Sequence, residues 1–173
     1  MKKLILIRHG QSVYNLENKF TGWEDVDLTD KGKSEANYAI SLLKNIKIDK
    51  AYTSNLKRAQ ETLSIILNGL NLNINVVKDE RLNERDYGDL IGQNKKDASL
   101  KFGKDQVQIW RRSYNVPPPG GESLEMTYNR CVPYFKNSIL KDILKYNIIL
   151  SAHANSIRAI VKYLLNLSPE LIL

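Results

Sequence analysis

The two histidines of the chain, His9 and His153, are the residues best placed to do chemistry. Each follows a short apolar run that predicts a buried strand, residues 3–7 before His9 and residues 148–151 before His153. Active sites of open parallel sheets lie at the carboxyl ends of the strands. We therefore expect the two imidazoles to face each other at one edge of a sheet. A structural hydrogen bond, the ordinary role of a single histidine, accounts less well for two histidines placed in the same way.

Arginines lie close to these histidines in the sequence. Arg8 directly precedes His9, and Arg58 follows the end of a third expected strand, residues 51–53. Guanidinium groups keep a neighbouring imidazole neutral and nucleophilic, and they bind the oxygens of a phosphoryl group. A second imidazole can donate a hydrogen bond to the charge that builds up during transfer. The pattern therefore indicates phosphoryl transfer.

The elements that must position these residues alternate between short apolar runs and helical patterns. This order predicts an α/β fold with three layers, α/β/α, around a mostly parallel central sheet, in a single domain of residues 1–173. Pro133 bends or breaks the helix that Ser123 begins. The expected strands are 3–7, 51–53, 75–78 and 148–151, and the expected helices are 29–46, 56–69, 100–110, 123–143 and 156–165.

Composition excludes several classes of protein. With 173 residues, 42% apolar and 26% charged, the chain is typical of a soluble globular protein. Its one cysteine, Cys131, excludes an internal disulfide, and no Cys/His spacing predicts zinc. The apolar run 4–7 is too short for a signal peptide, and no stretch could span a membrane, so we expect a cytoplasmic protein. The net charge of +7 favours anionic partners, but the scattered lysines are more typical of a solvated surface.

Seven segments carry a family resemblance. In order along nearly the whole chain they resemble motifs of the cofactor-dependent phosphoglycerate mutases, a branch of the histidine phosphatase superfamily. Arg-His-Gly alone would be a weak signal, whereas the whole set in order is a strong one. The segments are 8–15 (RHGQSVYN), 20–29 (FTGWEDVDLT), 52–59 (YTSNLKRA), 82–88 (LNERDYG), 106–114 (QVQIWRRSY), 122–124 (ESL) and 151–156 (SAHANS).

The resemblance implies a phosphoryl shuttle. His9 would carry the phosphoryl group as phosphohistidine, primed by 2,3-bisphosphoglycerate, and no metal is implied. The reaction would interconvert 2-phosphoglycerate and 3-phosphoglycerate, a step of glycolysis and gluconeogenesis. The partners would be small phosphorylated three-carbon acids, with no nucleic acid and no membrane. The assembly state stays open between a monomer and a homo-oligomer.

The resemblance also assigns roles to residues. Glu84 would be the general acid and base, because an alcohol attacks poorly unless its proton leaves; the alternative is an ion pair with Arg85. His153 would stabilise the transition state, and Arg8 and Arg58 would bind phosphoryl oxygens. The implied substrate-binding residues are Gln11, Ser12, Asn15, Thr21, Gly22, Arg85, Tyr87, Lys95, Arg111, Arg112, Ala154 and Asn155.

Two residues depart from the family pattern. Ala154 stands where the family has glycine, so the alanine is strained if that residue needs positive φ, or it narrows the pocket if it does not. Asp86 adds negative charge near Glu84, where it either raises the pKa of Glu84 or turns to solvent.

The end of the sequence is unusual. Residues 168–170 (SPE) form a helix-start signal three residues before the last residue, which suggests a shortened product; the alternative is a single frayed turn. A shortened product would leave a sheet edge bare and admit water to the phosphohistidine, which predicts more phosphatase activity relative to mutase activity. Two other functions remain open: a broad phosphomonoesterase using the same His9, and a non-enzymatic basic module.

Overall fold

The computed structural model describes residues 2–173, and its centre is a parallel sheet. The strand order is β1-β4-β2-β3, and every neighbouring pair runs parallel. The expected α/β fold is therefore confirmed. Because the strands are parallel, the carboxyl ends of β1, β4 and β2 meet at one edge. The strands are β1 (Leu4–Arg8), β2 (Lys50–Thr53), β3 (Val76–Lys78) and β4 (Ile148–Ala152).

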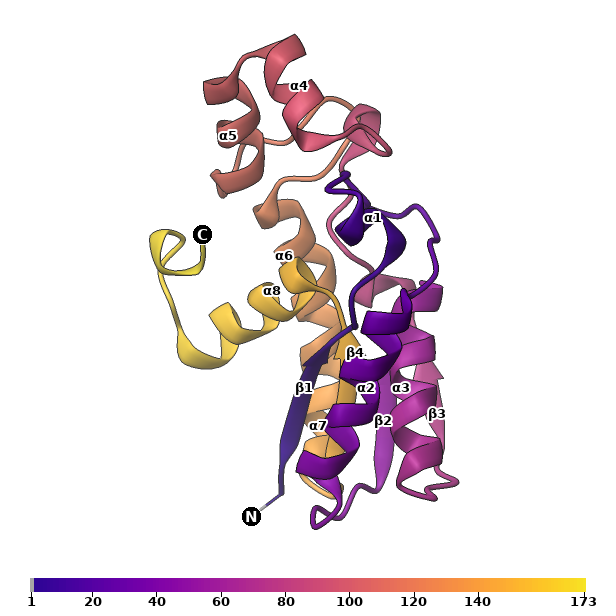
Figure 1. Ribbon diagram of the computed structural model, residues 1–173. Coiled ribbons are helices and arrows are strands. Elements are labelled where there is room, and N and C mark those ends of the chain that lie inside the picture. Colours follow the sequence, from indigo (N-terminus) through magenta and orange to yellow (C-terminus); the bar gives the residue numbers. More distant parts are fainter. Residues whose placement is uncertain (1) are drawn as a thin grey trace.

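Helices cover both faces of this sheet (Figure 1). α2 and α3 pack on one face, whereas α6, the turn after it and α8 pack on the other. Two further helices, α4 and α5, lie beyond the carboxyl ends of the strands (Figure 1). The helices are α1 (Val13–Leu16), α2 (Asp30–Leu43), α3 (Lys57–Gly69), α4 (Lys95–Phe102), α5 (Lys104–Arg112), α6 (Leu124–Tyr134), α7 (Leu140–Ile143) and α8 (Ala154–Leu165).

The layers follow from the alternation of side chains along a strand. In β4, Ile149 packs with Leu63 and Ile66 of α3. Its neighbour Leu150 points to the opposite face and packs with Phe135. Since successive residues of a strand face opposite sides, a run that is apolar throughout must be covered by helices on both faces. The predicted three-layer arrangement follows from this pattern.

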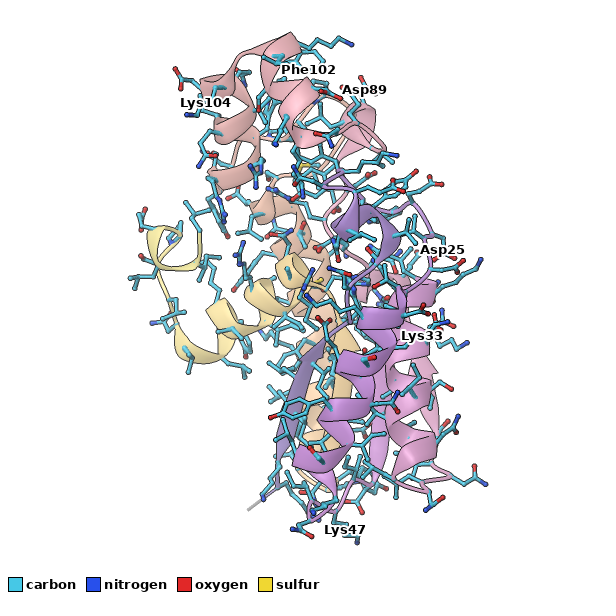
Figure 2. All side chains as sticks on the ribbon, in the orientation of Figure 1. Asp25, Lys33, Lys47, Asp89, Phe102 and Lys104 are labelled. Atoms are coloured by element: carbon cyan, nitrogen blue, oxygen red, sulfur yellow. The ribbon has the colours of Figure 1, made fainter. Side chains whose placement is uncertain are left out.

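The prediction of one helix over residues 100–110 was wrong. The structure has two helices there, and Gly103 separates them with φ 86° and ψ 139°. Glycine reaches that conformation without the steric cost that a Cβ imposes. Phe102 and Lys104, on either side of the break, lie at the opposite end of the molecule from Lys47 (Figure 2). The two short helices form a cap whose small core contains Phe20 and Val107.

The helix predicted over residues 123–143 is interrupted. Ser123 caps its beginning by accepting a hydrogen bond from the Met126 amide at 3.1 Å. Pro133 lies in the last turn of α6, and a π-helical turn, Phe135–Ile139, leads into α7. Proline has no N–H to donate and crowds the preceding turn, so a regular α-helix ends near it.

The last residues form one short turn. Glu170–Ile172 is a single 3₁₀ turn that follows Ser168 and Pro169. Among residues 2–173, no helix combines the length and the apolar character that crossing a membrane requires.

Candidate active site

Two neighbouring strand ends, those of β1 and β4, bring the two histidines together. His9 follows β1, and its backbone amide donates to the carbonyl of Ala152 at 3.0 Å. Ala152 ends β4, so His153 follows at the same level of the sheet. The two imidazole rings lie with their centroids 5.0 Å apart. The pairing expected from the strand ends is therefore present.

The surroundings of His9 hold its imidazole neutral. Its Nδ1 lies 2.6 Å from the carbonyl oxygen of Gly10. A carbonyl oxygen only accepts, so Nδ1 carries the proton and Nε2 keeps a free lone pair. Burial, together with the charges of Arg58 and Arg8, lowers the pKa of His9 to about 3. At neutral pH the side chain is thus a nucleophile, not a cation.

His153 is fully buried beside it. Its Nε2 is hydrogen-bonded to the Ser54 hydroxyl at 2.7 Å, and the Leu56 amide donates to the same hydroxyl. Nδ1 of His153 has no hydrogen-bond partner among the described residues. Burial first, then the charge of Arg58, places the pKa of His153 well below its ordinary value. The ring is therefore neutral, with Nδ1 left free to interact.

Arg58 and Arg8 place positive charge next to His9. Arg58 is 1% exposed in the first turn of α3, and its terminal nitrogens donate to the carbonyls of Gly22 at 2.8 Å and Glu24 at 2.9 Å. Its Nε has no hydrogen-bond partner among residues 2–173. Burial lowers the pKa of Arg58 to about 10, so it stays charged at neutral pH. Arg8 donates to the Asn15 side chain at 3.2 Å.

Glu84 reaches the site from an irregular loop. Its Oε1 accepts from the backbone amides of Arg85 at 2.9 Å and Asn155 at 3.0 Å. The guanidinium of Arg85 instead donates to the Tyr87 hydroxyl at 2.9 Å, so the alternative ion pair with Glu84 does not form. Asp86 accepts from the Gly88 amide at 3.0 Å, which engages its carboxylate in the turn.

These groups border a cavity of about 320 Å³. The wall is strongly cationic and has a single carboxylate, Glu84. Such a wall suits a small molecule with several negative charges, because guanidinium groups bind two oxygens of a phosphate or carboxylate at once. Burial, then the charges of Arg111 and Arg8, lowers the pKa of Lys95. The cationic residues of the wall are Arg8, Lys19, Arg58, Lys95, Arg111, Arg112 and Arg158.

All but four of the residues singled out from the sequence line this cavity. His153 lies buried behind His9, and the side chain of Arg85 packs on Tyr87. Gln11 accepts from the Thr29 hydroxyl at 2.9 Å, and the buried Ser12 caps α1. Those that line it are Arg8, His9, Asn15, Thr21, Gly22, Arg58, Glu84, Tyr87, Lys95, Arg111, Arg112, Ala154 and Asn155.

Sequence reasoning missed three residues of the wall, Lys19, Phe20 and Arg158. Arg158 lies four residues after Ala154 on α8, so helical spacing puts both on one face. This helical spacing from Ala154 could have identified Arg158 in the sequence. Lys19 follows α1 and pairs with Glu17 at 2.7 Å, a contact that no motif indicates.

Ala154 is not strained. It is the first residue of α8, and the non-glycine residues with positive φ among those described are Asn18, Asn71 and Asn166. Its methyl group therefore borders the cavity without a backbone cost, which leaves a narrower pocket as the consequence of the alanine.

Comparison with known proteins places the chain in a family. The sequence profile of the histidine phosphatase superfamily (branch 1) matches residues 4–173. A 2,3-bisphosphoglycerate-dependent phosphoglycerate mutase from Azorhizobium caulinodans is 52% identical over 171 residues, which cover 96% of this chain and 83% of the relative. A mutase of the same name from Nitrobacter winogradskyi is 54% identical and is covered to 84%.

Solved structures show the same fold. A mycobacterial glucosyl-3-phosphoglycerate phosphatase superposes with a TM-score of 0.85 at 26% identity, covering 99% of this chain and 82% of that one. A phosphoglycerate mutase from Bacillus anthracis superposes with a TM-score of 0.78 at 22% identity. The superposition covers 94% of this chain and 79% of that one.

The chain belongs to the histidine phosphatase superfamily. Within it, the chain groups with the 2,3-bisphosphoglycerate-dependent phosphoglycerate mutases, a family of isomerases.

Proposed function

We propose that this protein interconverts 2-phosphoglycerate and 3-phosphoglycerate through a phosphohistidine at His9. One observation carries the proposal: a neutral imidazole with a free Nε2 borders a cationic cavity that holds a single carboxylate. The names of the relatives support the choice of substrate. The proposal includes small phosphorylated three-carbon acids as partners.

The cavity wall suits 2,3-bisphosphoglycerate as the priming molecule. Its seven cationic side chains can bind two phosphoryl groups and a carboxylate, and Nε of Arg58 is a buried donor without a partner among the described residues. When bound, 2,3-bisphosphoglycerate supplies the phosphoryl group that primes His9. Arg8, Arg58 and Asn15 would hold phosphoryl oxygens, and Lys95, Arg111 and Arg112 would hold the other end of the molecule.

Three residues, His9, Glu84 and His153, have separate roles in the transfer of the phosphoryl group. Glu84 takes the proton of the phosphoglycerate hydroxyl while that oxygen bonds to phosphorus and the P–N bond to His9 breaks. In the reverse direction Nε2 of His9 attacks phosphorus, the P–O bond breaks, and Glu84 returns the proton to the leaving oxygen. His153 donates from Nδ1 to the charge that develops on the phosphoryl oxygens.

Labelling with radioactive 2,3-bisphosphoglycerate tests the covalent step. We expect an acid-labile, base-stable label on the unmodified protein and none on His9→Ala, because phosphohistidine needs the imidazole. The same sample should convert 3-phosphoglycerate to 2-phosphoglycerate. A folded, unlabelled protein would contradict the proposal. Labelling with phosphate release but no isomerisation would point to a phosphomonoesterase instead.

A further inference from the structure

One guanidinium outside the cavity wall, that of Arg130 on α6, holds the loop that carries Glu84. It donates to the carbonyls of Arg81 at 2.9 Å, Asn83 at 3.1 Å and Glu84 at 2.8 Å. The loop at residues 83–87 lies between two 3₁₀ turns and belongs to no helix or strand. Its position therefore depends on side chains that reach it from other elements.

Glu122 completes the support from the other side. Its carboxylate accepts two hydrogen bonds from Arg130, at 2.7 Å and 2.8 Å, and one from the Asp86 amide at 3.0 Å. The Glu122 amide donates back to the Asp86 carbonyl at 2.9 Å. The ion pair thus holds the loop on both sides of Glu84. Although burial opposes it, the contact with Arg130 keeps the pKa of Glu122 below its ordinary value, so the pair is ionised at neutral pH.

Trp23 contributes a second hydrogen bond to the Glu84 carbonyl. Its Nε1 donates to the Glu84 carbonyl at 2.6 Å, beside the bond from Arg130. Two donors on one carbonyl oxygen fix the backbone from which the Glu84 side chain projects. Since proton transfer needs an acid within hydrogen-bond reach of the leaving oxygen, a loosened backbone costs catalysis even when the carboxyl group is present.

We propose that Arg130, supported by Glu122 and assisted by Trp23, is a positioning residue that keeps Glu84 in place for proton transfer. The inference rests on the proposed phosphoryl transfer to His9. It implies that loss of the Arg130 guanidinium weakens the acid function of Glu84 while the nucleophile and the cationic wall remain intact.

The leaving group of the phosphoryl donor distinguishes this role from a general loss of structure. Transfer to His9 from 2,3-bisphosphoglycerate releases an alkoxide, which needs a proton from Glu84. Transfer from p-nitrophenyl phosphate releases a stable phenolate that needs far less acid assistance. We expect Arg130→Met to lower kcat/KM for phosphohistidine formation from bisphosphoglycerate by about tenfold or more relative to p-nitrophenyl phosphate.

Two further variants keep the test informative if Arg130→Met does not fold. Trp23→Phe removes only the second hydrogen-bond donor to the Glu84 carbonyl. We expect it to lower the ratio of kcat/KM for bisphosphoglycerate to kcat/KM for p-nitrophenyl phosphate, but by less than Arg130→Met does. Arg130→Lys keeps a charge and a donor, so it should restore part of the ratio. Val132→Ala removes buried methyl groups from the same helix without touching the loop. It should therefore change kcat/KM for bisphosphoglycerate and for p-nitrophenyl phosphate by the same factor.

The outcomes separate this inference from the proposed function. If neither donor labels the unmodified protein, the proposed function is wrong, and this inference is wrong with it. If both donors label it, but Arg130→Met and Trp23→Phe slow them by the same factor, Arg130 only stabilises the fold. A fall in kcat/KM for bisphosphoglycerate but not for p-nitrophenyl phosphate supports the role of Arg130 in positioning Glu84.

Discussion

At the scale of single residues, hydrogen bonds to the imidazoles decide which nitrogen is available. The Gly10 carbonyl fixes the proton of His9 on Nδ1, because a carbonyl cannot donate. Ser54 can either donate or accept, so its bond to Nε2 allows His153 to carry its own proton on Nδ1. In the proposed mechanism that proton points to the developing charge.

The hydroxyl of Ser54 should therefore matter for kcat. We expect Ser54→Ala to lower kcat by roughly tenfold or more, because His153 then loses the partner that orients its ring. Steady-state mutase assays measure this effect.

The neighbouring Thr53 offers a matched control for Ser54→Ala. Its hydroxyl is buried and has no hydrogen-bond partner among residues 2–173, so Thr53→Val should leave kcat unchanged. An unchanged kcat in Ser54→Ala, or an equal loss in both variants, would show that the hydroxyl does not orient His153.

At the scale of elements, the end of β1 packs backbone to backbone against the start of α2. A Cβ at Gly32 would collide with the carbonyl oxygen of Gln11, and a Cβ at Gly10 would collide with that of Gly32. The Gly10 amide also donates to Thr62 of α3 at 3.1 Å. The residue after His9 is thus held by two helices, which fixes the nucleophile.

Gly32→Ala should disturb the site from outside the cavity. The new methyl group must push α2 away from the chain that follows His9, and overpacking of this kind costs about 2 kcal/mol of unfolding free energy. We expect kcat to fall as well, because His9 moves with Gly10. Urea unfolding and mutase assays on the same sample provide the two measurements.

Gly69→Ala is the comparison for Gly32→Ala. A Cβ there meets no backbone atom but only the side chain of Ile40, nearest at the terminal Cδ1, which can rotate away. Its unfolding free energy should change by less than about 1 kcal/mol, with no change in kcat. Similar losses in both variants would refute the close-packing argument.

At the scale of the whole molecule, two buried neutral histidines make the fold sensitive to acid. The pKa of His9 is about 3 and that of His153 is well below the ordinary value of 6.5 that the unfolded chain has. Below pH 6.5 the two imidazoles therefore bind protons in the unfolded chain but stay neutral in the folded chain. The stability that the histidines contribute is present above pH 6.5 and is lost as the pH falls toward 3.

The free energy of unfolding should consequently drop between pH 7 and pH 5. His9 contributes about 2 kcal/mol to that drop, since its imidazole is almost fully protonated at pH 5 in the unfolded chain and neutral in the folded one. The lowered pKa of His153 acts in the same direction. Urea unfolding of the ligand-free protein at the two pH values measures it. His9→Gln should show a drop smaller by about 2 kcal/mol. An equal drop in both proteins would mean that His9 is protonated in the folded state.

The sequence alone determined the type of chemistry and the elements that carry it. Two histidines after apolar runs predicted a paired site at strand ends, and the structure places their rings 5.0 Å apart. Parallel strands share one carboxyl edge, so local patterns were enough for this. The cap at Ser123 was also predictable, because a capping residue acts on the turn directly after it.

Only the tertiary structure decided which side chains hold the loop of Glu84 and which acceptors the guanidinium groups bind. Arg130 and Trp23 reach the same carbonyl from distant parts of the chain, and the Arg85 guanidinium turns from the adjacent Glu84 to Tyr87. A side chain with several donors takes whichever acceptors the folded chain brings near it, and sequence spacing does not encode those neighbours. The break at Gly103 is of the same kind, since a single glycine within a helical pattern is compatible with either a helix or a turn until packing chooses.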